Sequence, residues 1–119
     1  MTTRLGASLS PLASGSLGGL MGSTHRGDLR LLLLDLLGTR AMTGADLREA
    51  ISRATDGRYR PSAGSIYPRL SNLVTRGLAT RNATKGLRRV EHSLTANGKE
   101  ELTSRRPDVQ RAWQRLLDF

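Results

Sequence analysis

The feature that most constrains this chain is a leucine-rich segment that begins at Asp28 and stops at Gly38. Its apolar residues recur at helical spacing, and additional leucines widen the apolar face beyond a single stripe. Asp28 suits the positive end of a helix dipole, and glycine is common just past a helix C-terminus. We therefore expect a helix buried on most sides. Its leucines are Leu29, Leu31, Leu32, Leu33, Leu34, Leu36 and Leu37.

A second helix is predicted to begin after Thr43, which has the spacing of a capping box with Asp46 in place of the usual Glu. One clean apolar stripe follows, and the pair Asp56-Gly57 ends the helix. The stripe consists of Leu47, Ala50, Ile51 and Ala54.

A third predicted helix has two faces of different chemistry. Ser62 is a good N-cap after Pro61, and Gly77 closes the helix. One face is apolar, whereas the opposite face has small residues and an amide but no acid. Small residues let a helix approach a groove closely, and Asn and Arg can pair bidentately with base edges. The apolar face is Ile66, Leu70, Leu73 and Val74; the polar face is Ser65, Pro68, Ser71, Asn72 and Thr75, flanked by Arg69 and Arg76.

Pro68 is unusual because it lies inside this third helix. Proline in a helix forfeits a hydrogen bond and clashes with the carbonyl four residues back, at a cost of about 3 kcal/mol or more. That carbonyl belongs to Gly64, whose backbone adjusts most readily. We interpret Pro68 as a tolerated kink rather than as a ligand-binding residue.

Two short extended runs at residues 78–81 and 88–94 predict a β-hairpin. In the second run, Val90, His92 and Leu94 alternate to one side. Basic residues near a hairpin turn suit phosphate contacts beside a groove, or they keep an edge strand soluble. These basic residues are Arg81, Lys85, Arg88 and Arg89.

The positive charge is concentrated in the same part of the chain. The 119 residues carry a formal net charge of +9, of which residues 57–92 supply +7. Such a block is typical of a polyanion partner such as nucleic acid, and the alternative is a solvated basic surface. The basic residues of the block are Arg58, Arg60, Arg69, Arg76, Arg81, Lys85, Arg88 and Arg89.

Composition excludes several classes of protein. The chain has no cysteine, which excludes disulfides, thiol nucleophiles and cysteine-ligated zinc. The histidines, His25 and His92, stand apart, and the sequence has no carboxylate pair at useful spacing, phosphate-binding glycine loop or metal-ligand cluster. We therefore expect no enzyme activity, no metal and no cofactor. No apolar run approaches the roughly 18 residues of a membrane span.

The two ends of the chain differ in character. Residues 1–25 are rich in Gly and Ser without an apolar period, which predicts a flexible tail rather than a targeting peptide or a minor-groove arm. Residues 95–119 predict a C-terminal helix capped by Thr95, with a kink or a break at Pro107.

The apolar residues of this C-terminal segment repeat every seven positions, like a coiled-coil seam. Such a face can dock on the chain's own core or pair with a second subunit. Trp113 is large for a small core, which favours pairing. The predicted dimer interface consists of Leu102, Val109, Trp113, Leu116 and Leu117.

The order of three helices, a hairpin and a final helix is that of a winged helix-turn-helix. The most specific run is Pro-Ser-x-Gly-x-Ile-Tyr-Pro-x-Leu at residues 61–70, and a weaker one is Leu-Thr-x-x-Gly at residues 94–98. With the stretches at 26–37, 43–47 and 76–78, these runs make the sequence from Gly27 to Leu102 resemble the PadR family of bacterial transcriptional regulators.

The predicted elements give a mainly α fold with a small β-hairpin, divided into the tail at 1–25, a winged helix-turn-helix domain at 26–94 and a dimerisation helix at 95–119. The tail does not map to the family pattern, whereas the resemblance covers the winged helix-turn-helix domain. The resemblance implies a cytoplasmic, nucleoid-associated homodimer that represses from a palindromic operator and releases DNA on binding a small hydrophobic or phenolic effector. It places Ser62, Ser65, Tyr67, Arg69 and Asn72 in the reading helix and Lys85, Arg88 and Arg89 in the wing; the basic block adds Arg58, Arg60 and Arg76.

The sequence departs from the family pattern at two places. His92 stands where the family usually has Tyr on the second wing strand, and the C-terminal region is short and interrupted by Pro107. An alternative interpretation of the basic face is a winged-helix module that binds an acidic protein partner. Retention on random duplex DNA distinguishes the two.

Overall fold

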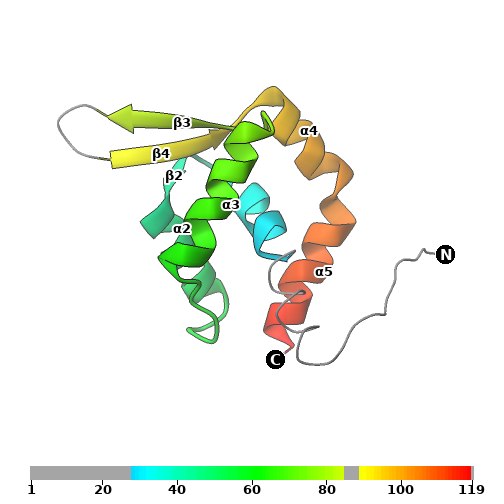
Figure 1. The fold of residues 1–119 in the computed structure, drawn as a ribbon. Helices are drawn as coiled ribbons and strands as arrows, with labels where there is room; N and C mark the ends of the chain where they lie inside the picture. The colour runs from blue at the N-terminus through cyan, green and yellow to red at the C-terminus, as the bar shows by residue number, and fades with distance from the viewer. Residues whose placement is uncertain (1–27, 85–88, 119) are drawn as a thin grey trace.

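The computed structural model describes residues 28–84 and 89–118. Its helices and strands follow the predicted order, which confirms a mainly α fold with a small sheet. In chain order they are a helix at residues 28–37, β2 (Met42–Thr43), α2 (Gly44–Ala54), α3 (Ala63–Thr75), β3 (Ala79–Thr84), β4 (Arg89–Leu94), α4 (Ala96–Ser104) and α5 (Arg106–Leu117) (Figure 1).

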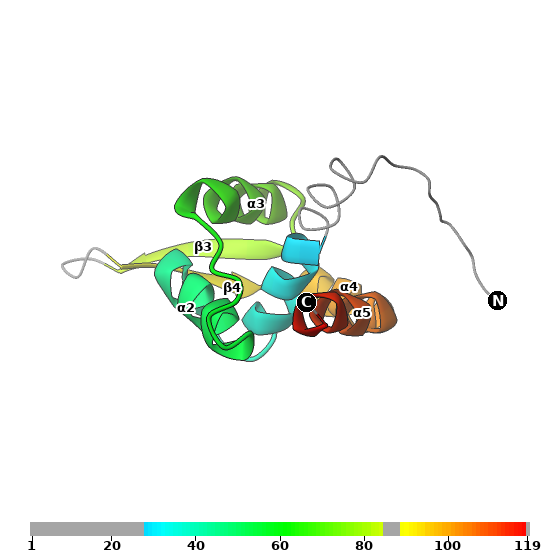
Figure 2. The same cartoon turned by 90° about the horizontal axis from the view of Figure 1, so that it is seen from below.

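The helix at residues 28–37 lies at the centre of the fold, as its leucines predict. Figure 2 shows this helix between α3 and α5. Its leucines are almost fully buried, except for the half-buried Leu36, and every later helix adds side chains to the same core. The added side chains are Leu47 and Ile51 from α2, Ile66, Leu70 and Leu73 from α3, Leu102 from α4, and Val109, Ala112 and Leu116 from α5.

The predicted capping box at the start of α2 is confirmed. The Thr43 hydroxyl accepts a hydrogen bond of 3.0 Å from the Asp46 N–H, and the Asp46 carboxylate accepts one of 3.1 Å from the Thr43 N–H. This backbone hydrogen bond is the main reason that the pKa of Asp46 lies below its usual value. Asp56 and Gly57 both have positive φ, 53° and 79°, and so turn the chain after α2.

Helix α3 begins and ends where the local signals predict. The Ser62 hydroxyl accepts from the Ser65 N–H at 3.2 Å, and Gly77 lies just past the helix with a φ of 76°. Pro68 is exposed within the helix, so its ring does not disturb the buried face. The helix therefore runs through Pro68 as one element.

The sheet has one strand more than the sequence predicts. β2 pairs antiparallel with β4, with Met42 opposite His92, and the strand order is β2-β4-β3. The predicted hairpin, β3 paired with β4, is present, and we call these two strands the wing. A strand of two residues has no alternation to reveal it, because only its partner strand makes it a strand.

The predicted C-terminal helix is two helices, with Pro107 in the first turn of α5. This is the predicted break, since proline is tolerated where a helix begins. The seven-residue seam packs within the chain: Leu102, Val109 and Leu116 are 6%, 1% and 1% exposed. In this conformation those three side chains are not available to a second subunit. Of the two alternatives, docking on the chain's own core is the arrangement found for them.

Polar contacts fix α5 antiparallel to the helix at residues 28–37. Near one end, the Arg115 guanidinium donates two hydrogen bonds to the Asp28 carboxylate, at 2.6 and 2.8 Å. Toward the other end, the Asp35 carboxylate accepts from the Trp113 indole at 2.8 Å and from Arg106 at 3.0 Å. Trp113 is thus half-buried against its own chain, and Leu117 is 45% exposed.

Candidate nucleic-acid interface

The outer face of α3 is exposed and carries no acidic side chain. The Asn72 amide on this face makes no hydrogen bond to any part of the chain that the structure describes. Its donors and acceptor are therefore available to a base edge. The exposed residues, which we call the outer face, are Tyr67, Pro68, Ser71, Asn72 and Thr75.

The two predicted serines take part in the helix start. Besides capping the Ser65 N–H, the Ser62 hydroxyl lies 3.2 Å from the Ser65 hydroxyl. Both stand at the N-terminus of α3, where backbone N–H groups and the helix dipole favour an anion such as a phosphate. Their position suits backbone contacts better than base contacts.

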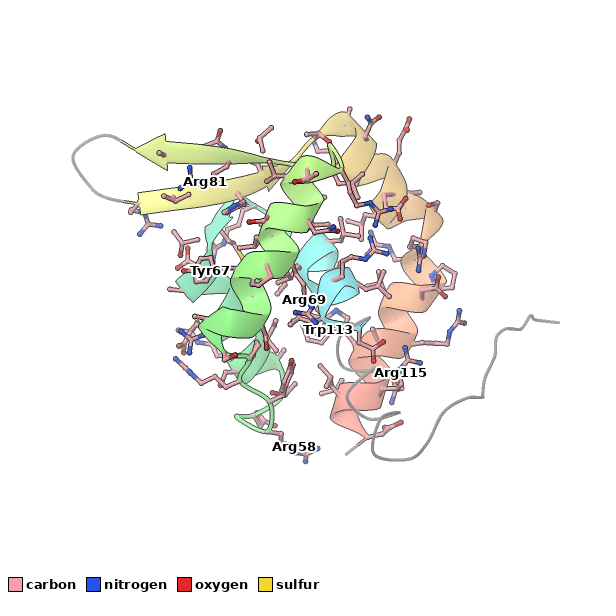
Figure 3. The ribbon with its side chains drawn as sticks, in the orientation of Figure 1. Arg58, Tyr67, Arg69, Arg81, Trp113 and Arg115 are labelled. Carbon is pink, nitrogen blue, oxygen red and sulfur yellow. The ribbon has the colours of Figure 1, made fainter. Side chains whose placement is uncertain are left out.

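Arg69 lies on a different side of α3 from the outer face. Its guanidinium is half-buried and donates to the Ser65 carbonyl at 2.8 Å. Figure 3 shows Tyr67 and Arg81 on the wing side of α3 and Arg69 on the side of the central helix. The Arg69 side chain therefore stabilises α3 through this hydrogen bond and is not part of the outer face.

The arginines that border the outer face differ in their pairing. Arg76, at the C-cap of α3, and Arg81, on β3, are exposed and have no ion pair or hydrogen bond among the residues described. Arg89 is half-exposed and lies 3.5 Å from Asp46 and 3.2 Å from Glu91. Arg76 and Arg81 therefore carry the charge that is available to a polyanion.

The other predicted basic residues do not gather on this surface. Arg60 pairs with Glu49 at 3.4 Å, and Arg58 donates to the Leu117 carbonyl at 3.1 Å, at the end of the molecule opposite the wing (Figure 3). Lys85 and Arg88 fall outside the described residues, as does the predicted tail at 1–25.

The structure also reveals a cavity that the sequence did not predict. It has a volume of about 600 Å³ and lies between the start of α2, the wing side of α3 and the strands of the wing. The Tyr67 ring packs so closely on Gly44 that a Cβ there would lie 2.6 Å from ring atoms. No local pattern signals this cavity, because strand pairing and helix packing bring its walls together.

The fold and this surface define a winged helix-turn-helix domain: a buried first helix, a helix pair, and a wing beside the acid-free outer face of α3. Residues 33–104 match the family model described as the transcriptional regulator PadR-like family. The chain belongs to this family. Its members are transcriptional regulators rather than enzymes, in agreement with the class predicted from the sequence.

Individual relatives support the same conclusion. The chain is 36% identical over 90 residues to the transcriptional regulator YqjI of Escherichia coli; the match covers 76% of this chain and 43% of that protein. The chain thus spans less than half the length of this curated relative.

Solved structures share the fold. A transcriptional regulator from Clostridium thermocellum superposes with a TM-score of 0.63 at 18% identity, covering 89% of this chain and 98% of that one. A PadR-like transcription factor from Bacteroides fragilis gives a TM-score of 0.60 at 21% identity, covering 84% and 93%. Within the described ranges, no helix has the length and apolar character needed to cross a membrane.

Proposed function

We propose that this chain is a homodimeric DNA-binding repressor that occupies a palindromic operator. The observation that carries the proposal is the exposed, acid-free outer face of α3. The Asn72 amide on this face and the Arg76 guanidinium at the C-cap have no partner among residues 28–84 and 89–118. In this proposal α3 enters the major groove and the wing lies along the flanking backbone.

The proposed contacts divide into two kinds. Asn72 reads a base edge, for which an amide suits the N6 and N7 atoms of adenine. Arg76 and Arg81, with Arg89 and the basic residues of the wing turn, bind phosphates and supply affinity without sequence preference. The serines at the start of α3 add backbone contacts.

Dimerisation places two copies of α3 in successive major grooves, about 34 Å apart on one face of the duplex. Because the apolar seam of α5 is used within the chain, we propose that dimerisation uses its exposed side, where Leu117 lies, and the outer edge of Trp113. The repressor is proposed to act on the bacterial nucleoid and to leave the operator when a small hydrophobic or phenolic effector binds.

Selection of bound sequences from a random duplex pool tests the proposal. We expect the selected sequences to contain inverted half-sites. The logarithm of the DNA-binding constant should fall linearly with the logarithm of the salt concentration, with a slope of about −0.9 per phosphate contact. Asn72→Ala should relax the preference at one position of each half-site. Arg76→Gln and Arg81→Gln should each weaken binding to all duplexes by a similar factor. Each should also reduce the magnitude of the salt-dependence slope by about 1 per protomer.

Arg111→Gln is the matched control, because Arg111 is an exposed arginine on α5 that pairs with Asp108. It should bind DNA as the parent chain does. Affinity for random duplex equal to that for selected sequences, or binding indifferent to salt, would contradict sequence-specific recognition. No retention on any duplex DNA would favour the acidic-protein alternative. Sedimentation of a monomer on the selected operator would refute the dimer.

A further inference from the structure

His92 lies on the central strand of the sheet and faces the cavity that separates the wing from α3. It is only 5% exposed, and its Nδ1 is buried without a hydrogen-bond partner among residues 28–84 and 89–118. A protonated imidazole has a second N–H donor and a positive charge, both of which need a partner when they are buried. This position is therefore suited to the neutral form of the ring.

The charged side chains that line the cavity are cations. In the register of β3 and β4, Arg81 lies directly opposite His92, so that both side chains are on the same face of the sheet. Arg89 lines the cavity from β4 itself. Like charges directly opposite each other on neighbouring strands destabilise the pair. Protonation of His92 would thus place a second positive charge against Arg81.

No carboxylate among the described lining residues compensates that charge. Glu91 is adjacent to His92 on β4, and successive side chains of a strand point to opposite faces. The Asp46 carboxylate is already paired with Arg89, at 3.5 Å. From α3 the cavity receives the phenol of Tyr67, which offers no carboxylate, and the lining residues of β2 and α2 do not titrate.

These surroundings determine how the stability of the fold depends on pH. Burial, and then the charge of Arg81, lower the pKa of His92 below its ordinary value near 6.5, so the imidazole is neutral at pH 7. Because the pKa is lower in the folded than in the unfolded chain, the stabilisation by neutral His92 is complete above pH 6.5. It is lost as the pH falls from there through the folded value.

We propose that His92 makes the docking of the wing on α3 sensitive to pH, with the neutral imidazole holding the two together and the protonated imidazole loosening them. The charge is best solvated when the cavity opens to water, and the cavity opens when the wing moves away from α3. A loosened wing no longer lies along the flanking DNA backbone, so the affinity for the operator falls in acid. This second part rests on the proposed function, whereas the loosening of the wing does not.

Nuclear magnetic resonance of the full chain tests the loosening without DNA. His25 is the only other histidine of the sequence, so His25→Gln assigns the imidazole signal of His92 and is also the matched control. We expect His92 to titrate below about pH 6.5. As it does so, the backbone amides of β3 and β4 should exchange their hydrogens faster, after correction for the intrinsic effect of pH, while those of α5 should not.

Two variants separate the charge of His92 from the packing of its ring. His92→Phe keeps an aromatic ring but cannot be protonated, so wing exchange should no longer respond to pH. Arg81→Gln leaves the imidazole in place and removes the opposing charge, so His92 should titrate closer to pH 6.5 and the wing should loosen less in acid. Arg111→Gln on α5 should change neither.

A His92 that titrates at or above about pH 6.5, wing exchange that is unchanged in acid, or an equal acid response in His92→Phe would overturn the proposal. Operator affinity measured over the same range should fall in acid, with a slope of log K against pH that approaches 1 per protomer. Affinity independent of pH while wing exchange rises would overturn the second part alone. Absence of DNA binding at every pH would refute the proposed function, while hydrogen exchange still decides the role of His92.

Discussion

Replacement of Arg115 by alanine tests how the C-terminal helix is held to the centre of the fold. The Arg115 guanidinium donates two hydrogen bonds to the Asp28 carboxylate, whose side chain is only 6% exposed. A hydrogen bond to a charged group contributes about 1.5–3 kcal/mol when it is well shielded. The Arg115 side chain is 47% exposed, so solvent screening reduces the contribution of the pair to about 2 kcal/mol.

Urea denaturation followed by far-ultraviolet circular dichroism measures this loss. A cost of about 2 kcal/mol corresponds to a fall in Tm of about 8–16 °C for a domain of this size. Arg111→Ala is the control on the same helix. Arg111 pairs with Asp108, and both side chains are more than one-third exposed. That substitution should cost less than about 0.5 kcal/mol.

A double-mutant cycle with Asp28→Asn separates the pair from other effects of the substitution. The coupling free energy between Asp28 and Arg115 should be at least about 1 kcal/mol, since each group loses its partner when the other is replaced. If Arg115→Ala costs no more than Arg111→Ala, or if the coupling is near zero, the pair does not hold α5 in place and the reasoning fails.

Four further predictions concern the packing and capping of the helices. Gly98→Ala should destabilise the fold by about 3 kcal/mol, because a Cβ there would lie 2.0 Å from the Leu78 carbonyl oxygen; thermal unfolding measures it. Gly64→Ala should instead raise the free energy of unfolding by about 0.5–1 kcal/mol, because a Cβ there would meet only the Ser62 hydroxyl, at 3.8 Å. A decrease of that size would show that the added methyl group is not accommodated. Thr43→Ala should cost about 1 kcal/mol through loss of the cap, and an unchanged urea midpoint would argue against it. The depressed pKa of Asp46 means that its contribution is complete above pH 3.8 and is lost as pH falls through the lower folded value; the stability gap to Asp46→Asn should therefore close in acid.

Local signals predicted the helices and their limits well. Thr43 and Ser62 cap as expected, and Gly77 closes α3, because capping depends on residues three or four positions apart. The same holds for the break at Pro107. The outer face of α3 was likewise predictable, since helical periodicity alone determines which residues share a face.

Features that depend on distant parts of the chain were not predictable. The apolar repeat through Val109 indicates that one face of α5 is buried, but a repeat does not specify whether the covering surface is the same chain or another. Similarly, the charge distribution along the sequence placed Arg58 in one block with the basic residues around α3. In the structure Arg58 instead donates a hydrogen bond to the Leu117 carbonyl. Predicting the cavity between α2, α3 and the wing would have required the relative positions of all three of these elements.

The antiparallel pairing of α5 with the central helix has a consequence for biosynthesis. Asp28 and Arg115 are 87 residues apart, yet among the described helices the earliest in the chain is covered by the latest. At a synthesis rate of roughly 5–20 residues per second, about 4–17 s pass between synthesis of the leucines at residues 28–37 and synthesis of the α5 residues that cover them. During that interval the nascent domain exposes the apolar surface that α5 will bury, and it is then most prone to aggregate.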